Sequence, residues 1–246
     1  MRLRRLRVCL RLRRRRSVTT PGRARPARAD LERQSEGLAG LRGRLLRRVQ
    51  VATRTRIVDL GAGTGAVTGE LVRRGGGEVL AVDAQPDFLE LDPEPFAGAK
   101  RVCCDAADLP LPDRSVDLVF CQLGLLWMPL EAVLDEVSRV LIPGGAFVSI
   151  EPDIGGLIEH PPERAVKDLW LRGLRTAGAD PEVARKIPGA LAARGLHPIV
   201  EVLPQVGPVG PERLNMLHGL PFAAEDQIRL ARLASQPPGQ PWEVFA

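Results

Sequence analysis

Three glycines at alternate positions follow a short apolar run in the segment IVDLGAGTG, residues 57–65. Glycines placed directly after a buried strand let the main chain turn sharply and approach a ligand closely, because no Cβ stands in the way. A helix that begins after such a turn presents free N–H groups and the positive end of its dipole. Gly61, Gly63 and Gly65, with Asp59 before them, therefore predict a site for an anionic or carboxylate-bearing, nucleotide-like ligand.

An acid ends the next apolar run. Asp83 closes the segment EVLAVD at 78–83, and GAGTGA at 61–66 satisfies the dinucleotide-binding pattern G-x-G-x-x-A. In that pattern a carboxylate after the second strand binds the ribose. On these residues alone, a dinucleotide-dependent oxidoreductase stays open as an interpretation.

Two further segments separate the alternatives. The run D-A-x-x-L-P-x-P-D-x-S-x-D-L-V begins at Asp105, and R-V-L-x-P-G-G ends a helical pattern at 139–145. Neither is expected of a nicotinamide dehydrogenase. With VDLGAGTG and VLAVDAQPDFL they span about residues 57–150, and in this order they resemble the class I S-adenosylmethionine-dependent methyltransferases, most of all the small-molecule branch typified by quinone-biosynthesis methyltransferases.

The resemblance implies S-adenosylmethionine as the cofactor and a role for each matching residue. Asp59 would hold the turn and the cofactor's amino group, Asp83 would accept the ribose hydroxyls, and Asp105 would accept the adenine amino group. The remaining implied contacts are Gly61, Ala62, Gly63 and Gly65 at the methionine portion, Ala84, Gln85 and Phe88 beside the adenosine, Ala106 beside the adenine ring, and Cys121, Gln122 and Leu123 below the reactive methyl group, with Leu126 and Trp127 continuing the rim.

Several of these residues also have structural interpretations that the sequence leaves open. Asp83 is placed to cap the following helix, and Asp105 is placed to stabilise a turn. Gln122 also fits a polar surface loop, and Trp127 fits the hydrophobic core.

Methyl transfer does not require a strong catalytic group from the protein, because a sulfonium already activates its methyl group. A general base is needed only if the acceptor must lose a proton. Candidates follow the fifth predicted strand: Glu151, Asp153, Glu159 and His160. A metal site is not expected, because the four cysteines have no CxxC spacing and the three histidines are dispersed.

Apolar runs that alternate with helical patterns must position these residues. Strands are predicted at 56–60, 78–83, 100–105, 116–123 and 146–151, a sixth at 197–203, and a final strand at 241–246 that closes the sheet edge. Helices are predicted at 66–74, 85–91, 129–141, near 163–177 and 182–194, along a leucine stripe at 30–49 that Asp30 would cap, and as two short helices within 205–240. The pattern predicts an α/β, Rossmann-like open sheet of about seven mostly parallel strands with helices on both faces.

The N-terminal segment differs from the rest of the chain. Residues 1–28 hold twelve arginines and no acid, whereas the remainder is net acidic. We expect a disordered Arg-rich arm at 1–28 and a methyltransferase domain at 29–246, with the cofactor-binding core at about 55–151 and a substrate-side part at 152–246. Such an arm also suits binding to RNA or anionic lipid, or an organelle transit peptide. An RNA or protein methyltransferase that docks through this arm is therefore the second interpretation.

Other patterns narrow the function further. No run of 18 apolar residues predicts a membrane span. Cys103, Cys104 and Cys121 lie in apolar runs, which predicts reduced core thiols and a cytoplasmic protein. The acidic body argues against a large nucleic-acid groove. A small-molecule acceptor, held by residues from 1–50, 155–180 and 205–240, is the expectation.

Overall fold

The computed structural model describes residues 28–202, 207–209, 214, 217–235 and 242–245. The arm predicted at 1–28 lies outside the described residues except for Arg28, at which the first helix begins. None of the helices in the described ranges is both long and apolar enough to cross a membrane.

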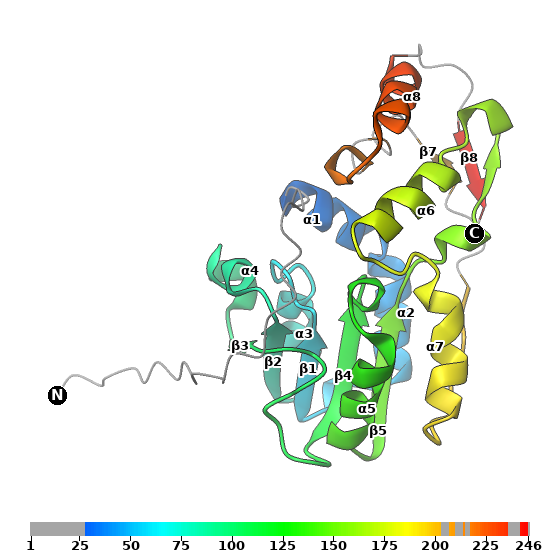
Figure 1. Ribbon diagram of the computed structural model, residues 1–246. Coiled ribbons are helices and arrows are strands. Elements are labelled where there is room, and N and C mark those ends of the chain that lie inside the picture. Colours follow the sequence, from blue (N-terminus) through cyan, green and yellow to red (C-terminus); the bar gives the residue numbers. More distant parts are fainter. Residues whose placement is uncertain (1–27, 203–206, 210–213, 215–216, 236–241, 246) are drawn as a thin grey trace.

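A five-stranded sheet forms the centre of the molecule (Figure 1). All neighbouring strands pair in parallel, in the order β3-β2-β1-β4-β5. The strands are β1 (Arg56–Leu60), β2 (Glu78–Asp83), β3 (Ala99–Cys103), β4 (Val116–Gln122) and β5 (Leu141–Ile150). The predicted parallel α/β sheet is confirmed.

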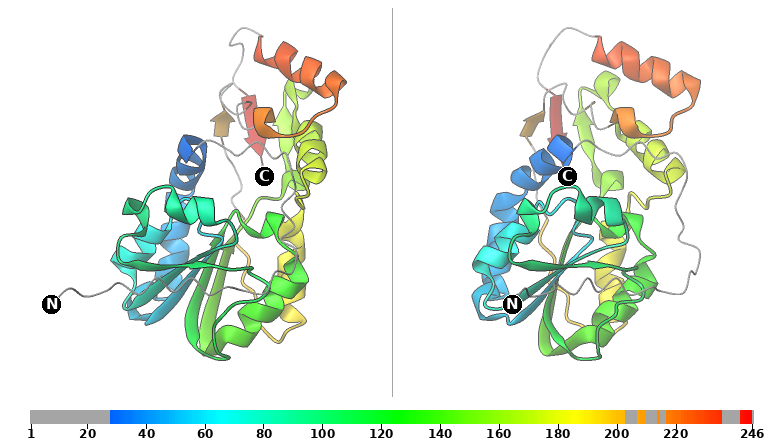
Figure 2. Two further views of the ribbon diagram at one scale, coloured as in Figure 1. Left: turned by 60° about the vertical axis from the view of Figure 1, so that its left-hand side comes forward. Right: turned by 90° about the vertical axis from the view of Figure 1, so that its left-hand side faces the viewer.

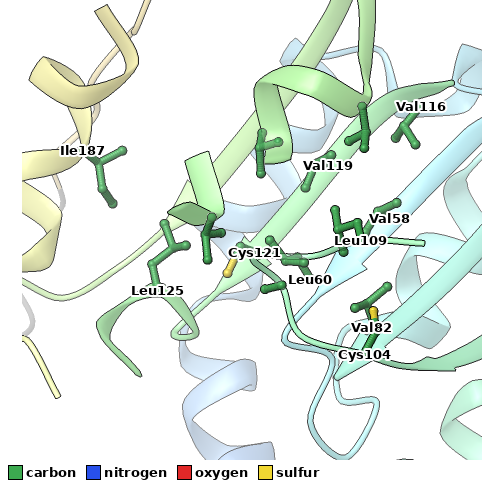
Figure 3. Close-up of a cluster of buried hydrophobic side chains, with 14 of the residues drawn as sticks. Val58, Leu60, Val82, Cys104, Leu109, Val116, Val119, Cys121, Leu125 and Ile187 are labelled. Atoms are coloured by element: carbon green, nitrogen blue, oxygen red, sulfur yellow. The ribbon is translucent and has the colours of Figure 1, made fainter. Parts of the chain in front are cut away.

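Alternate side chains of these strands build two cores. On one face α2 (Ala39–Arg48) and α3 (Thr68–Arg74) cover a cluster that includes Ile57, Val79, Leu118 and Phe120. On the other face α5 (Leu130–Val140) and α7 (Val183–Ala192) cover a cluster that includes Val58, Leu60, Val82, Val119 and Cys121 (Figure 3). The predicted helices on both faces are thus confirmed.

The predicted number of strands, about seven, is wrong. Residues 197–202, expected as the sixth strand, have no regular secondary structure, and Ile199, Val200 and Val202 are exposed. The last strand, β8 (Trp242–Phe245), pairs antiparallel with β6 (Ile158–His160) and β7 (Gly207–Val209) in a second sheet instead of closing the first. An apolar run predicts that a strand forms but carries no information about its pairing partner.

The second sheet belongs to a group of elements that follows β5. With it come α6 (Lys167–Thr176), a short 3-10 helix (Leu217–Gly219) and α8 (Ala224–Ala234). Val166, Leu169, Leu217 and Leu230 give this group a small core of its own. Figure 1 shows it beyond the carboxyl ends of β4 and β5, and Figure 2 shows α1 and α6 on opposite sides of those ends.

Two boundaries differ from the sequence prediction. The leucine stripe forms two helices, α1 (Arg28–Gly37) and α2, separated at Leu38, and Asp30 lies inside α1 instead of capping it. β5 begins at Leu141, ahead of the predicted position, because a bulge accommodates Pro143-Gly144-Gly145 within the strand.

Candidate functional site

The strand order reverses between β1 and β4, which makes this position the switch point of the sheet. The chain leaves β1 toward β2 and β3 on one side, and β4 is followed by β5 on the other. Ligands of open parallel sheets bind at such a switch point, outside the carboxyl ends of the strands. The glycine loop (residues 61–67) and the β4 turn (residues 123–128) lie at these ends.

The three glycines of the glycine loop all have positive φ, at +73°, +55° and +83° for Gly61, Gly63 and Gly65. A Cβ on Gly65 would lie 2.8 Å from Pro95 and 3.0 Å from the Phe96 ring, so that glycine is required for packing. A Cβ on Gly63 would meet no atom closer than 4.0 Å. Gly63 therefore borders open space into which a ligand can approach the main chain.

Asp83 at the end of β2 holds the glycine loop. Its Oδ2 accepts the Gly63 N–H at 2.9 Å, and its Oδ1 accepts the Gln85 N–H at 2.8 Å. Burial raises the pKa of this carboxyl, while N–H donors that include those of Gln85 and Gly63 oppose the rise. The Gln85 bond forms a turn just ahead of α4 (Pro86–Glu90), whose N-cap residue is Gln85, so Asp83 does not bond an N–H within the helix. Gly63 of the glycine loop thus lies beside the segment Asp83, Ala84 and Gln85.

Asp59 lies beneath the glycine loop. Its Oδ2 accepts a hydrogen bond of 2.6 Å from the Thr68 hydroxyl, and both residues are buried. Burial raises the pKa of Asp59 to about 6, against the effect of the Thr68 bond. Thr68 begins α3, so the pair fastens the helix to β1.

The end of β3 adjoins Asp83. Cys104 donates its N–H to the Asp83 carbonyl at 3.2 Å, which brings Asp105 and Ala106 to the same edge. Asp105 is exposed and its Oδ1 accepts the Ala107 N–H at 2.9 Å, as a turn residue would. Phe88 is half-buried on α4.

The end of β4 lies on the other side of the switch point. Cys121 is buried, and burial raises the pKa of its thiol well above the ordinary value. Leu123 has φ +57° and donates its N–H to the Ile150 carbonyl at 2.9 Å. The Gln122 side-chain oxygen accepts a 3.0 Å hydrogen bond from Arg42. Trp127 is half-buried and packs on the core cluster, as the core interpretation expected.

Arg42, which the sequence does not single out, reaches the end of β4. It is 5% exposed, its Nε donates to Glu70 at 2.6 Å, and its Nη1 also donates to the Ser35 carbonyl at 2.8 Å. Nothing in the sequence around Arg42 distinguishes it from the other arginines of this arginine-rich chain. Thr68 was missed as well, although its position on the first turn after the glycines was a usable signal.

The candidate bases are dispersed. Both oxygens of Glu151 face N–H groups of the β4 turn. Glu159 accepts the N–H groups at the start of α6, and Asp153 pairs with Arg185. His160 is exposed in β6 of the second sheet.

The described cysteines also depart from one expectation. Cys104 and Cys121 are buried as predicted, but Cys103 is exposed, so its predicted place in the core is wrong. The reason is that β3 is an edge strand, on which alternate side chains meet solvent.

Comparison with known proteins identifies the class. Residues 58–149 match the family described as a methyltransferase domain. The chain is 42% identical over 105 residues to malonyl-[acyl-carrier protein] O-methyltransferase of Halorhodospira halophila, which covers 40% of this chain and 36% of that protein. It is 39% identical over 99 residues to the biotin biosynthesis bifunctional protein BioHC of Cellvibrio japonicus, over 39% of this chain and 20% of that protein. The chain thus spans well under half the length of these curated relatives.

Solved structures agree on the fold. The YcgJ protein of Bacillus subtilis superposes with a TM-score of 0.57 at 18% identity, over 82% of this chain and 94% of that one. Geranyl diphosphate C-methyltransferase of Streptomyces coelicolor gives 0.53 at 14% identity, over 90% and 84%. Residues 58–149, the part that the family matches, thus form a methyltransferase domain of the class I S-adenosylmethionine-dependent kind.

Proposed function

We propose that this protein binds S-adenosylmethionine and transfers its methyl group to a small-molecule acceptor by in-line displacement. The observation that carries the proposal is the open space over Gly63, whose N–H is fixed by the carboxylate of Asp83 at the switch point of the sheet. A nucleoside ligand can approach the main chain there while its ribose meets a fixed acceptor.

The residues around this space fit the parts of the cofactor. Asp83 would accept the ribose hydroxyls and Asp105 the adenine amino group, beside Ala106 and Phe88. Asp59 would accept the cofactor's amino group, directly or through water. The carboxylate of the cofactor would be drawn to the side where Arg42 reaches Gln122, because a buried guanidinium is a strong donor to carboxylates.

When bound, the cofactor supplies an activated methyl group on a sulfonium. The protein's part is to align the acceptor and keep water out, and alignment alone can supply ~7–11 kcal/mol of the barrier. Cys121 and Leu125 are buried and apolar below the site, which favours a dry floor. A base is required only for an acceptor that must lose a proton.

The acceptor would lie between α1 and the group of elements formed by α6, α8 and the second sheet, beyond the strand ends (Figure 2). One relative is named malonyl-[acyl-carrier protein] O-methyltransferase, so we include small acyl groups, free or attached to a carrier, among the candidate acceptors. Cys103, Cys104 and Cys121 form no disulfide within the described residues, which supports a reducing compartment, and we propose the cytoplasm.

Isothermal titration tests the cofactor. The full chain should bind S-adenosylhomocysteine and not NADH, and tight binding of NADH alone would overturn the proposal in favour of an oxidoreductase. Transfer of a labelled methyl group should then be measured on a panel of small acids, phenols and thioesters, with RNA and an unrelated protein as competing acceptors. Label that enters only RNA or protein would contradict a small-molecule acceptor.

A further inference from the structure

The carboxylate of Glu151 fastens the turn on which the floor of the site depends. Glu151 follows the last residue of β5, and its Oε1 accepts the N–H groups of Gly124 at 3.0 Å and Leu125 at 2.8 Å. Its Oε2 lies 3.4 Å from the Leu126 nitrogen. The side chain that follows β5 thus accepts three successive main-chain N–H groups of the β4 turn.

The β4 turn touches the glycine loop directly. A Cβ built on Gly61 would lie 2.9 Å from the Met128 side chain and 3.7 Å from the Gly124 Cα. A Cβ on Gly124 would lie 2.8 Å from the Cys121 sulfur. A shift of Gly124 would therefore change its packing both against Gly61 and against Cys121 at the end of β4.

The same turn reaches the acceptor side. The Leu126 carbonyl accepts the Asp180 N–H at 2.7 Å, just ahead of α7. The β4 turn is therefore held by main-chain hydrogen bonds at two places, to Glu151 and to Asp180. These bonds determine its position between the proposed cofactor and acceptor.

We propose that Glu151 is a positioning residue: its ionised carboxylate holds the β4 turn against the glycine loop in the binding-competent shape, and its protonation releases the turn. This inference rests on the proposed cofactor site. It assigns Glu151 a role through the main chain, in place of the general-base role that its position after the fifth strand suggested.

The electrostatic surroundings allow this switch to operate near neutral pH. Burial raises the pKa of Glu151 to about 7, although the N–H groups of Leu125, Gly124 and Leu126 oppose the rise. Hydrogen bonds to an ionised acceptor are roughly twice as strong as those to a neutral one, so protonation weakens the hold on the turn.

Few charged groups among the described residues lie near enough to Glu151 to affect its protonation. From β4 the Cys121 thiol lies 3.8 Å from Oε1, and Asp59 of β1 acts on the same thiol. On the side of α7, Asp153 is paired with Arg185 and Asp180 with Lys186. Residues 123–128 of the turn itself carry no titratable side chain.

Glu151→Gln is the test, because an amide keeps one accepting oxygen but cannot titrate. Glu159→Gln is the matched control, since Glu159 accepts two main-chain N–H groups at the start of α6, at 2.9 and 2.6 Å. The dissociation constant of S-adenosylhomocysteine is measured by titration calorimetry on the full chain at pH 6, 7 and 8. If only the ionised form is competent, the wild type should bind about tenfold more weakly at pH 6 than at pH 8.

The Glu159→Gln variant should keep this dependence, and Glu151→Gln should reduce it to about twofold. An unchanged pH dependence in Glu151→Gln overturns the inference. Hydrogen exchange of the Gly124–Leu126 amides in the unliganded wild type gives a second readout that needs no variant and no cofactor. Relative to the Val166 and Lys167 amides, which Glu159 holds, their protection should fall between pH 8 and pH 6, and constant protection also overturns the inference.

The two proposals fail in different ways. If S-adenosylhomocysteine binds the wild type at no pH, the proposed function fails, while the exchange measurement still decides whether Glu151 holds the turn.

Discussion

The guanidinium of Arg42 donates a hydrogen bond to the Gln122 side-chain oxygen at 3.0 Å, which ties helix α2 to the end of β4. The same group binds Glu70 of α3 at 2.6 Å, and Arg74 binds the other oxygen of Glu70. One inward arginine therefore joins α2, α3 and the floor of the proposed site.

Replacement of Arg42 by Ala should lower the free energy of unfolding by about 2–3 kcal/mol, because it removes charge-assisted hydrogen bonds from a buried position. Glu70 keeps Arg74, so the loss should stay below that of a fully isolated charge. Urea denaturation measures it. Arg44→Ala, an exposed position on the same helix, should change stability by no more than about 0.5 kcal/mol. Equal effects of both variants would show that the network contributes nothing.

Replacement of Asp83 by Ala should weaken S-adenosylhomocysteine binding by roughly 5- to 150-fold, or about 1–3 kcal/mol, because ligand and glycine loop both lose a carboxylate acceptor. Titration calorimetry measures the loss. Glu90→Ala removes an exposed acid from nearby α4 and should leave the affinity unchanged. An Asp83→Ala variant with wild-type affinity would remove this carboxylate from the site.

Gly63 and Gly65 should respond differently to alanine. At Gly63 the added methyl group enters open space, so the variant should fold with a loss of about 1 kcal/mol yet lose ligand affinity. At Gly65 the methyl group meets Pro95 and Phe96, so we expect a loss of about 3 kcal/mol in stability. Thermal melts and titration on both variants separate the effects. A Gly63→Ala protein that binds ligand as well as the wild type would show that the ligand lies elsewhere.

Stability should fall as pH rises from about 4 to about 7. Burial raises the pKa of Asp59 from 3.8 to about 6 and that of Glu151 from 4.5 to about 7. Each group therefore binds its proton more tightly in the folded protein than in the unfolded chain, so unfolding releases protons in this window and becomes easier with rising pH. The two groups together should lower the free energy of unfolding by several kcal/mol, at most about 3 kcal/mol each.

Urea denaturation of the unliganded protein at pH 5 and pH 8 measures this dependence. Asp59→Asn should lose the part of it that lies below about pH 6. Acids whose pKa is lowered, such as Glu70 and Glu136, act in the opposite direction but at lower pH. A stability that rises from pH 5 to pH 8 would contradict the assignment.

Deletion of residues 1–27 should leave the affinity for S-adenosylhomocysteine unchanged, because the proposed contacts, from Arg42 to Leu123, all lie after this segment. Calorimetry compares the two forms. A shortened chain that folds but no longer binds would give the arginine-rich segment a direct part in the site.

The position of the glycine loop was predictable, because glycines directly after a short apolar run indicate a turn at the end of a buried strand. The same holds for Asp83, which ends an apolar run directly. Arg42 and the hold of Glu151 on the β4 turn were not predictable in this way, since their partners lie 80 and 25–27 positions away in the chain. The functional roles of the cofactor-contact residues stay predictions until a ligand is measured.

Local patterning by itself determined the parallel α/β core, the glycine loop and the acids at the ends of β2 and β3, because burial and turn formation act on neighbouring residues. Tertiary structure alone decided that β8 joins a second sheet, that Cys103 faces solvent, and that Arg42 is buried. Those outcomes depend on contacts between segments that are distant in the sequence. The energy of such contacts depends on the shape and charge of both segments, so neither segment alone predicts them.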